Sequence, residues 1–154
     1  MLAEGADGAI GIAALSEQKQ EIGPNKTTNY NTFFASLDPD GKLLGQRELD
    51  LDRDDWPLGL AACEGGFCIA GETATTWVDT GSQVEFGQGF IVAVGLDGNP
   101  IAQARLHGPR HNVIEALAPL EDGGVVFAGT TDGPITHTDP VELSSTALLG
   151  VLRL

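Results

Sequence analysis

The chain has 154 residues, of which 22 are acidic and 8 are basic, so its formal net charge at pH 7 is −14. This charge argues against a partner that is nucleic acid or an anionic membrane, because both bind basic patches. No apolar stretch approaches the ~18 residues of a membrane span, which argues against membrane insertion.

In chain order, short apolar stretches alternate with turn-forming residues. No segment keeps the i, i+3, i+4 apolar spacing of an amphipathic helix. The composition, with 21 glycines and 42% hydrophobic residues, suits a protein with many turns and a filled core. The sequence therefore predicts an all-β fold, with its clearest strands at FFASL (33–37), LLGQREL (43–49), LGLAAC (58–63), FCIAG (67–71), FIVAV (90–94), PIAQARL (100–106), EALAPL (115–120) and VVFAG (125–129).

An internal repeat explains this order. EGGFCIAGET (64–73) matches DGGVVFAGTT (122–131) at an offset of 58, whereas Asp40-Gly41 matches Asp97-Gly98 at 57, so a one-residue slip lies between Cys63 and Glu64. TALLGVLRL at the C-terminus matches GFIVAVGLD (89–97) at 57. Repeats of this kind are typical of solenoids, propellers and arrays.

Each repeat contains four predicted strands, as does a β-propeller blade, which is a four-stranded antiparallel sheet. We predict an incomplete propeller, and a tandem β-sandwich is the alternative because its strands have similar spacing. The predicted units are the back half of a blade over 1–31, whole blades over 32–88 and 89–145, and the first strand of a further blade over 146–154.

These motifs resemble the β-propeller repeats of bacterial secreted and cell-surface proteins. The resemblance covers an apolar strand, Asp-x-Asp-Gly, a second strand, an acidic patch before an aromatic residue, and a Gly-Gly turn before a strand that ends in Ala-Gly-x-Thr. These elements stand at 33–49 and 54–73, and the second repeat departs from them where HNV (111–113) replaces DDW (54–56). The resemblance implies a propeller architecture and an extracytoplasmic location, and it carries no catalytic residue.

The two cysteines also bear on the compartment. If Gly65-Gly66 forms a two-residue turn, Cys63 lies opposite Cys68 in the close position of an antiparallel pair. This spacing predicts a disulfide, which forms in an oxidising compartment, and two buried thiols are the alternative.

The predicted binding region consists of the long irregular connections, because these emerge together on one face of a propeller. They are residues 16–31, 50–59, 73–88, 107–112 and 131–145. The candidate ligand-binding residues are Trp77, whose ring suits a sugar, together with Asp79, Asp54 and Asp55. Asp50, Asp52, Asp54 and Asp55 also suggest calcium, but the spacing lacks the glycine and glutamate of an EF-hand loop. A solvated acidic loop is the simpler interpretation of this segment.

All three histidines, His107, His111 and His137, fall on the same predicted face. Three imidazoles can hold zinc with a fourth position open to water, so a zinc site is an alternative to surface histidines. No nucleophile elbow, phosphate-binding glycine loop or H-E-x-x-H motif accompanies them.

We therefore expect an extracytoplasmic binding or scaffold module with a protein or carbohydrate ligand and no required cofactor. A metal-dependent hydrolase or lyase that uses the histidines is one alternative, and a purely structural repeat array is another. Because the predicted strands are too few for the ~4 blades of a small propeller, we expect closure by a homo-oligomer or by the remainder of a longer propeller.

Overall fold

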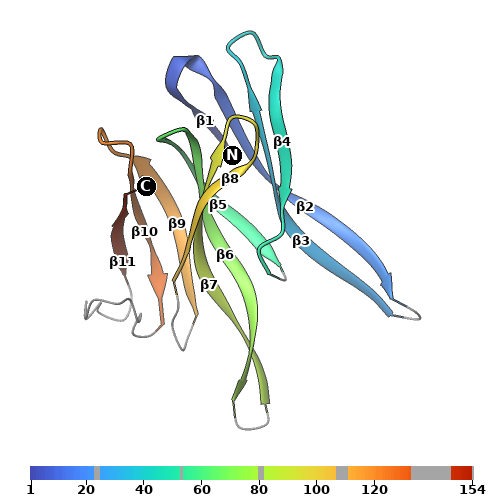
Figure 1. The fold of residues 1–154 in the computed structure, drawn as a ribbon. Coiled ribbons are helices and arrows are strands. Elements are labelled where there is room, and N and C mark those ends of the chain that lie inside the picture. The colour runs from blue at the N-terminus through green and yellow to red at the C-terminus, as the bar shows by residue number, and fades with distance from the viewer. Residues whose placement is uncertain (23–24, 53, 80–81, 107–110, 133–146, 154) are drawn as a thin grey trace.

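The computed structural model describes residues 1–22, 25–52, 54–79, 82–106, 111–132 and 147–153. The strands in these ranges form three antiparallel sheets (Figure 1). The all-β prediction is confirmed, and no helix in the described part is long and apolar enough to cross a membrane. Sheet I contains β1 (Leu2–Glu4), β2 (Ile10–Ile22), β3 (Asn25–Leu37) and β4 (Leu43–Leu49). Sheet II contains β5 (Asp55–Cys63), β6 (Gly66–Asp79), β7 (Ser82–Gly95) and β8 (Pro100–Arg105). Sheet III contains β9 (Asn112–Pro119), β10 (Val125–Thr131) and β11 (Leu148–Leu152).

Tight turns that contain a positive-φ glycine recur at equivalent places in the three sheets. Gly8, which ends the short 3-10 turn Ala6–Gly8, has φ 75°, and its equivalents Gly65 and Gly123 have φ 77° and 85°. Gly41 and Gly98 have φ 83° and 82° in the following turn of sheets I and II. Glycine adopts these angles without steric cost, so the repeat in sequence is also a repeat in backbone conformation.

The sheet boundaries differ from the predicted unit boundaries. We expected segments 16–31 and 73–88 to be irregular loops. Their described residues, 16–22 with 25–31 and 73–79 with 82–88, form the distal halves of two long hairpins, β2–β3 and β6–β7. Pairing satisfies their backbone N–H and C=O groups, and their Thr, Val and Phe residues suit strands. Each sheet therefore joins the second half of one predicted unit to the first half of the next.

Sheet II lies between the other two sheets and is buried on both faces. Phe67, Ile69, Phe90, Val92 and Val94 pack against sheet I, whereas Cys68, Ala70, Ile91 and Ala93 pack against sheet III. Successive side chains of a strand point to opposite faces, so strands buried on both sides are apolar at every position. This explains why FCIAG and FIVAV show no polar alternation.

The β5–β6 turn differs by one residue from the prediction. Cys63 pairs with Gly66, so the turn residues are Glu64 and Gly65, and Cys63 and Cys68 are diagonal rather than opposite. Gly65 supplies the positive φ. Gly66 belongs to β6, where a Cβ atom would lie 2.1 Å from the carbonyl oxygen of Val94. The two cysteines still lie at disulfide-bonding distance, with Cα atoms 5.8 Å apart, as the sequence predicted.

The C-terminal strand also differs by one residue from its predicted alignment. Leu148 pairs with Gly129, as Phe90 pairs with Gly71 in sheet II, so the structural offset is 58 rather than 57. This register places Leu148 in the core against sheet II and Leu149 on the outside, where it is 69% exposed.

Candidate functional site

The molecule has two different ends (Figure 1). The tight turns around Gly8, Gly41, Gly65, Gly98 and Gly123 lie at one end, which we call the turn end. The opposite end carries the long hairpins β2–β3 and β6–β7 and the connection from β4 to β5 (50–54), and we call it the hairpin end. Three of the predicted long connections therefore share one end, whereas residues 107–110 and 133–145 of the other two lie outside the described residues.

Asp54 and His111 occupy equivalent positions at the hairpin end, just before the first strand of sheets II and III. Asp54 Oδ1 accepts a hydrogen bond from the backbone N–H of Tyr30, at 2.9 Å, and His111 Nδ1 accepts one from the N–H of Gly87, at 3.1 Å. Their carbonyl oxygens also accept equivalent bonds, from the N–H groups of Ala74 and Asp132. Both side chains therefore anchor the base of a long hairpin of the preceding sheet.

Glu72 adds a charge to the His111 position. Its Oε1 lies 3.5 Å from His111 Nδ1. Burial raises the pKa of the Glu72 carboxyl, and the charge that His111 carries when it is protonated opposes this effect. Gly87 leaves room for the arrangement, since a Cβ atom there would lie 1.8 Å from Glu72 Oε1. Because Nδ1 accepts the Gly87 hydrogen bond, the imidazole in this geometry carries its proton on Nε2.

Asp55 and Asn112 form a second equivalent pair, and both are fully buried. Asp55 Oδ2 accepts from the N–H of Leu51 at 2.7 Å, and Asn112 Oδ1 accepts from the N–H of Gly89 at 2.7 Å. Burial raises the pKa of Asp55 more than its hydrogen-bond partners lower it. The Thr73 hydroxyl lies next to the Asp55 carboxyl and helps to lower its pKa. Neither the Thr73 hydroxyl nor Asp55 Oδ1 makes a hydrogen bond of ordinary geometry. Asp55, one of the predicted ligand-binding residues, has no exposed surface in this structure.

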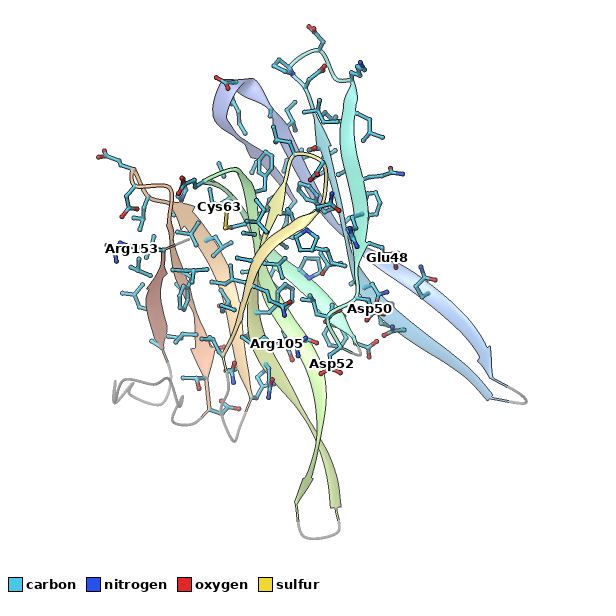
Figure 2. The ribbon with its side chains drawn as sticks, in the orientation of Figure 1. Glu48, Asp50, Asp52, Cys63, Arg105 and Arg153 are labelled. Carbon is cyan, nitrogen blue, oxygen red and sulfur yellow. A yellow bond between two sulfur atoms is a disulfide. The ribbon has the colours of Figure 1, made fainter. Side chains whose placement is uncertain are left out.

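Charged residues line the space between β4 and β8 (Figure 2). The guanidinium of Arg105 lies 3.6 Å from the Asp52 carboxylate and donates a hydrogen bond to the Leu51 carbonyl, so it ties β8 to the β4–β5 connection. An adjoining pocket of about 300 Å³ is open to solvent and is lined by Arg47, Glu48, Leu49, Asp50, Leu51, Val92, Pro100 and Gln103. Asp50 is exposed there, which leaves its carboxylate accessible to a ligand.

Glu48 lies on the outer surface of sheet I, beside the β2–β3 hairpin. The amide of Gln18 donates to both of its carboxylate oxygens, at 2.8 and 2.7 Å, and Asn31 donates to Oε1 at 3.1 Å. The hydrogen bond from Gln18 is the main cause that lowers the pKa of Glu48. This polar cluster covers the part of sheet I next to the hairpin end.

Trp77 and Asp79 lie near the tip of the β6–β7 hairpin, where Trp77 pairs with Val84 and Asp79 with Ser82. His107 and His137 lie outside the described residues. Within the part of the chain that the structure describes, no group of three His, Cys, Asp or Glu residues is placed to hold a metal. The carboxylates of Asp52, Asp54 and Asp55 have different partners: Arg105, the Tyr30 N–H and the Leu51 N–H.

Our reading of the sequence missed Glu72, Arg105 and Tyr30. A signal for two of them is a difference between repeats: Glu72 stands where Thr130 stands in the second copy, and Arg105 stands where Glu48 stands in the first. A charge that is absent from the other copy, as at Glu72, or reversed in it, as at Arg105, indicates a contact specific to one copy.

No family model matches this chain. No curated protein matches its sequence either.

Proposed function

We propose that this chain is a β-propeller-type binding or scaffold module that acts outside the cytoplasm and binds a protein or carbohydrate ligand at its hairpin end. In this proposal the three sheets are blades. The observation that carries it is the pair of long hairpins, β2–β3 and β6–β7, which extend from the same end of the packed sheets (Figure 1). Binding residues are commonly held on such extensions of a rigid scaffold.

The cysteine pair supports the location. Cys63 and Cys68 lie at bonding distance, and disulfides persist mainly in oxidising compartments. The net charge of −14 favours ligands that are neutral or basic. The metal-dependent alternative is less favoured, because His111 already uses Nδ1 to anchor a hairpin.

A glycan array tests the carbohydrate form of the proposal. We expect the purified protein to bind a subset of glycans and Trp77→Ala to weaken that binding at least ~10-fold, because no smaller side chain replaces the ring area of tryptophan. Ile101→Ala is the matched control, since Ile101 is 58% exposed near the turn end. Equal losses in both variants would contradict a site on the β6–β7 hairpin. Stoichiometric zinc that survives dialysis would favour the hydrolase alternative instead.

A further inference from the structure

The two outer faces of the three-sheet stack carry side chains equivalent to those with which the sheets pack on each other inside the molecule. In sheet II, the face toward sheet I is built from Phe67, Ile69, Phe90, Val92 and Val94. At the 57-residue offset, the equivalent residues of sheet I are Ile10, Ile12, Phe33, Ala35 and Leu37. These residues form the outer surface of sheet I, which we call the front face.

The front face has the composition of a packing surface but covers no other sheet within the described part of the chain. Ile10, Ile12, Phe33 and Leu37 are each partly exposed. Leu2, which pairs with Ile12, is 74% exposed, whereas Leu60, which pairs with Ile69 in sheet II, packs into the core between sheets I and II. A hollow of about 520 Å³ on this face is lined by Leu2, Ala3, Glu4, Gly8, Ile10 and Pro39.

The outer surface of sheet III shows the complementary pattern. The face of sheet II toward sheet III is built from Cys68, Ala70, Ile91 and Ala93. The registers make Val126, Ala128, Leu149 and Val151 their equivalents in sheet III. We call these four residues, with the exposed Ala116 and Ala118 beside them on β9, the back face. Leu149 and Val151 are 69% and 49% exposed.

We propose that the front face of one copy of this chain packs against the back face of a second copy, and that two copies close into a ring of six sheets. The repeat specifies the partner surface. Inside the molecule, the surface of sheet II that is equivalent to the front face packs against sheet I, and the surface of sheet II that is equivalent to the back face packs against sheet III. The free front face of one copy therefore fits the free back face of another. Both are present on the same chain. Such a front-to-back contact is heterologous and makes a closed ring when the rotation between copies is suitable. Six sheets fall within the 4–8 blades of known propellers. This inference does not depend on the ligand proposed above.

Association should strengthen with salt, in contrast to binding driven by opposite charges. Each copy carries a formal charge of −14, so two copies repel, and added salt screens that repulsion. The contact itself is apolar and gains from burial of exposed leucine and valine side chains.

The oligomeric state tests the proposal with two single variants. Ile12→Lys disrupts the front face and Leu149→Lys disrupts the back face, and each makes the chain less negative, so weaker association cannot come from added repulsion. Light scattering should give the wild type a mass of twice 16.0 kDa. Each variant alone should be a monomer, with a Kd raised at least ~10-fold.

Mixing the two variants is the decisive measurement. The mixture should form a 1:1 dimer, because the intact back face of Ile12→Lys meets the intact front face of Leu149→Lys. Circular dichroism and thermal unfolding should show that both variants stay folded. A monomeric wild type at ~100 μM, larger rings or filaments, a dimer kept by either variant alone, or a mixture that stays monomeric would each overturn the proposal.

Discussion

Buried polar side chains stand at the start of the first strand in sheets II and III. Asp55 and Asn112 stand at equivalent buried positions and both accept hydrogen bonds from backbone N–H groups. The difference between them is one formal charge. Burial disfavours the charged carboxylate, which is why the pKa of Asp55 is raised.

Replacement of Asp55 by the residue found at the equivalent position should make the protein more stable at neutral pH. The folded-state pKa of Asp55 lies above its unfolded value, so its contribution to stability is complete below the unfolded pKa and is lost as the pH rises through the folded pKa. Asp55→Asn removes this loss. Its advantage over the wild type should be present at pH 7, should shrink as the pH falls through the folded-state pKa of Asp55, and should be absent below ~4.

Urea unfolding at pH 3, 5 and 7 measures this effect. Asp40→Asn, at an exposed turn residue, is the control and should show no such trend. A variant that is less stable than the wild type at pH 7 would mean that the carboxylate makes hydrogen bonds that an amide cannot replace.

At the scale of elements, the long hairpins depend on side chains from the next sheet. His111 anchors the base of the β6–β7 hairpin through Gly87, and Asp54 anchors the β2–β3 hairpin through Tyr30. Tyr30 also stacks near Trp56, with ring centroids 6.3 Å apart, so Trp56 acts in packing. A proposed binding element is therefore held by contacts that are not local in sequence.

Loss of the His111 acceptor should destabilise the protein even if His111 has no ligand. His111→Ala leaves the buried Gly87 N–H without a partner, which costs about 1–3 kcal/mol. His111→Asn should cost less, because Asn Oδ1 can accept the same hydrogen bond, as Asp54 Oδ1 does in sheet II. Urea unfolding at pH 8 compares the two variants. Equal costs would show that the contact with Glu72, rather than the hydrogen bond, is what matters at this position.

At the scale of the whole molecule, the three sheets differ in how far they are buried. Sheet II is covered on both faces, whereas sheets I and III each have one open face. The front and back faces defined above form apolar patches on these open surfaces, and monomeric proteins rarely expose large apolar patches. The stack of three sheets therefore has, on each outer side, a surface of the kind that packs against another sheet.

Hydrogen exchange should report this difference in burial. Amides of residues 67–71 and 90–94 should exchange most slowly, because opening them exposes two cores at once. Amides of β11 should exchange faster, since in the described residues it pairs only with β10. Exchange of the wild type at a concentration where it is monomeric gives the measurement, and equal protection in β7 and β11 would contradict the central position of sheet II.

The sequence by itself determined the strand class, the repeat and the cysteine pair, because turn glycines and apolar stretches act over a few residues. It did not determine which strands share a sheet: residues 16–31 and 73–88 are polar enough to be loops, and only backbone pairing across each hairpin makes them strands. The roles of Asp55 and His111 also required the tertiary structure. Burial of a carboxylate and acceptance of a hydrogen bond by a particular nitrogen depend on residues from a neighbouring sheet, and the spacing along the chain does not encode those contacts.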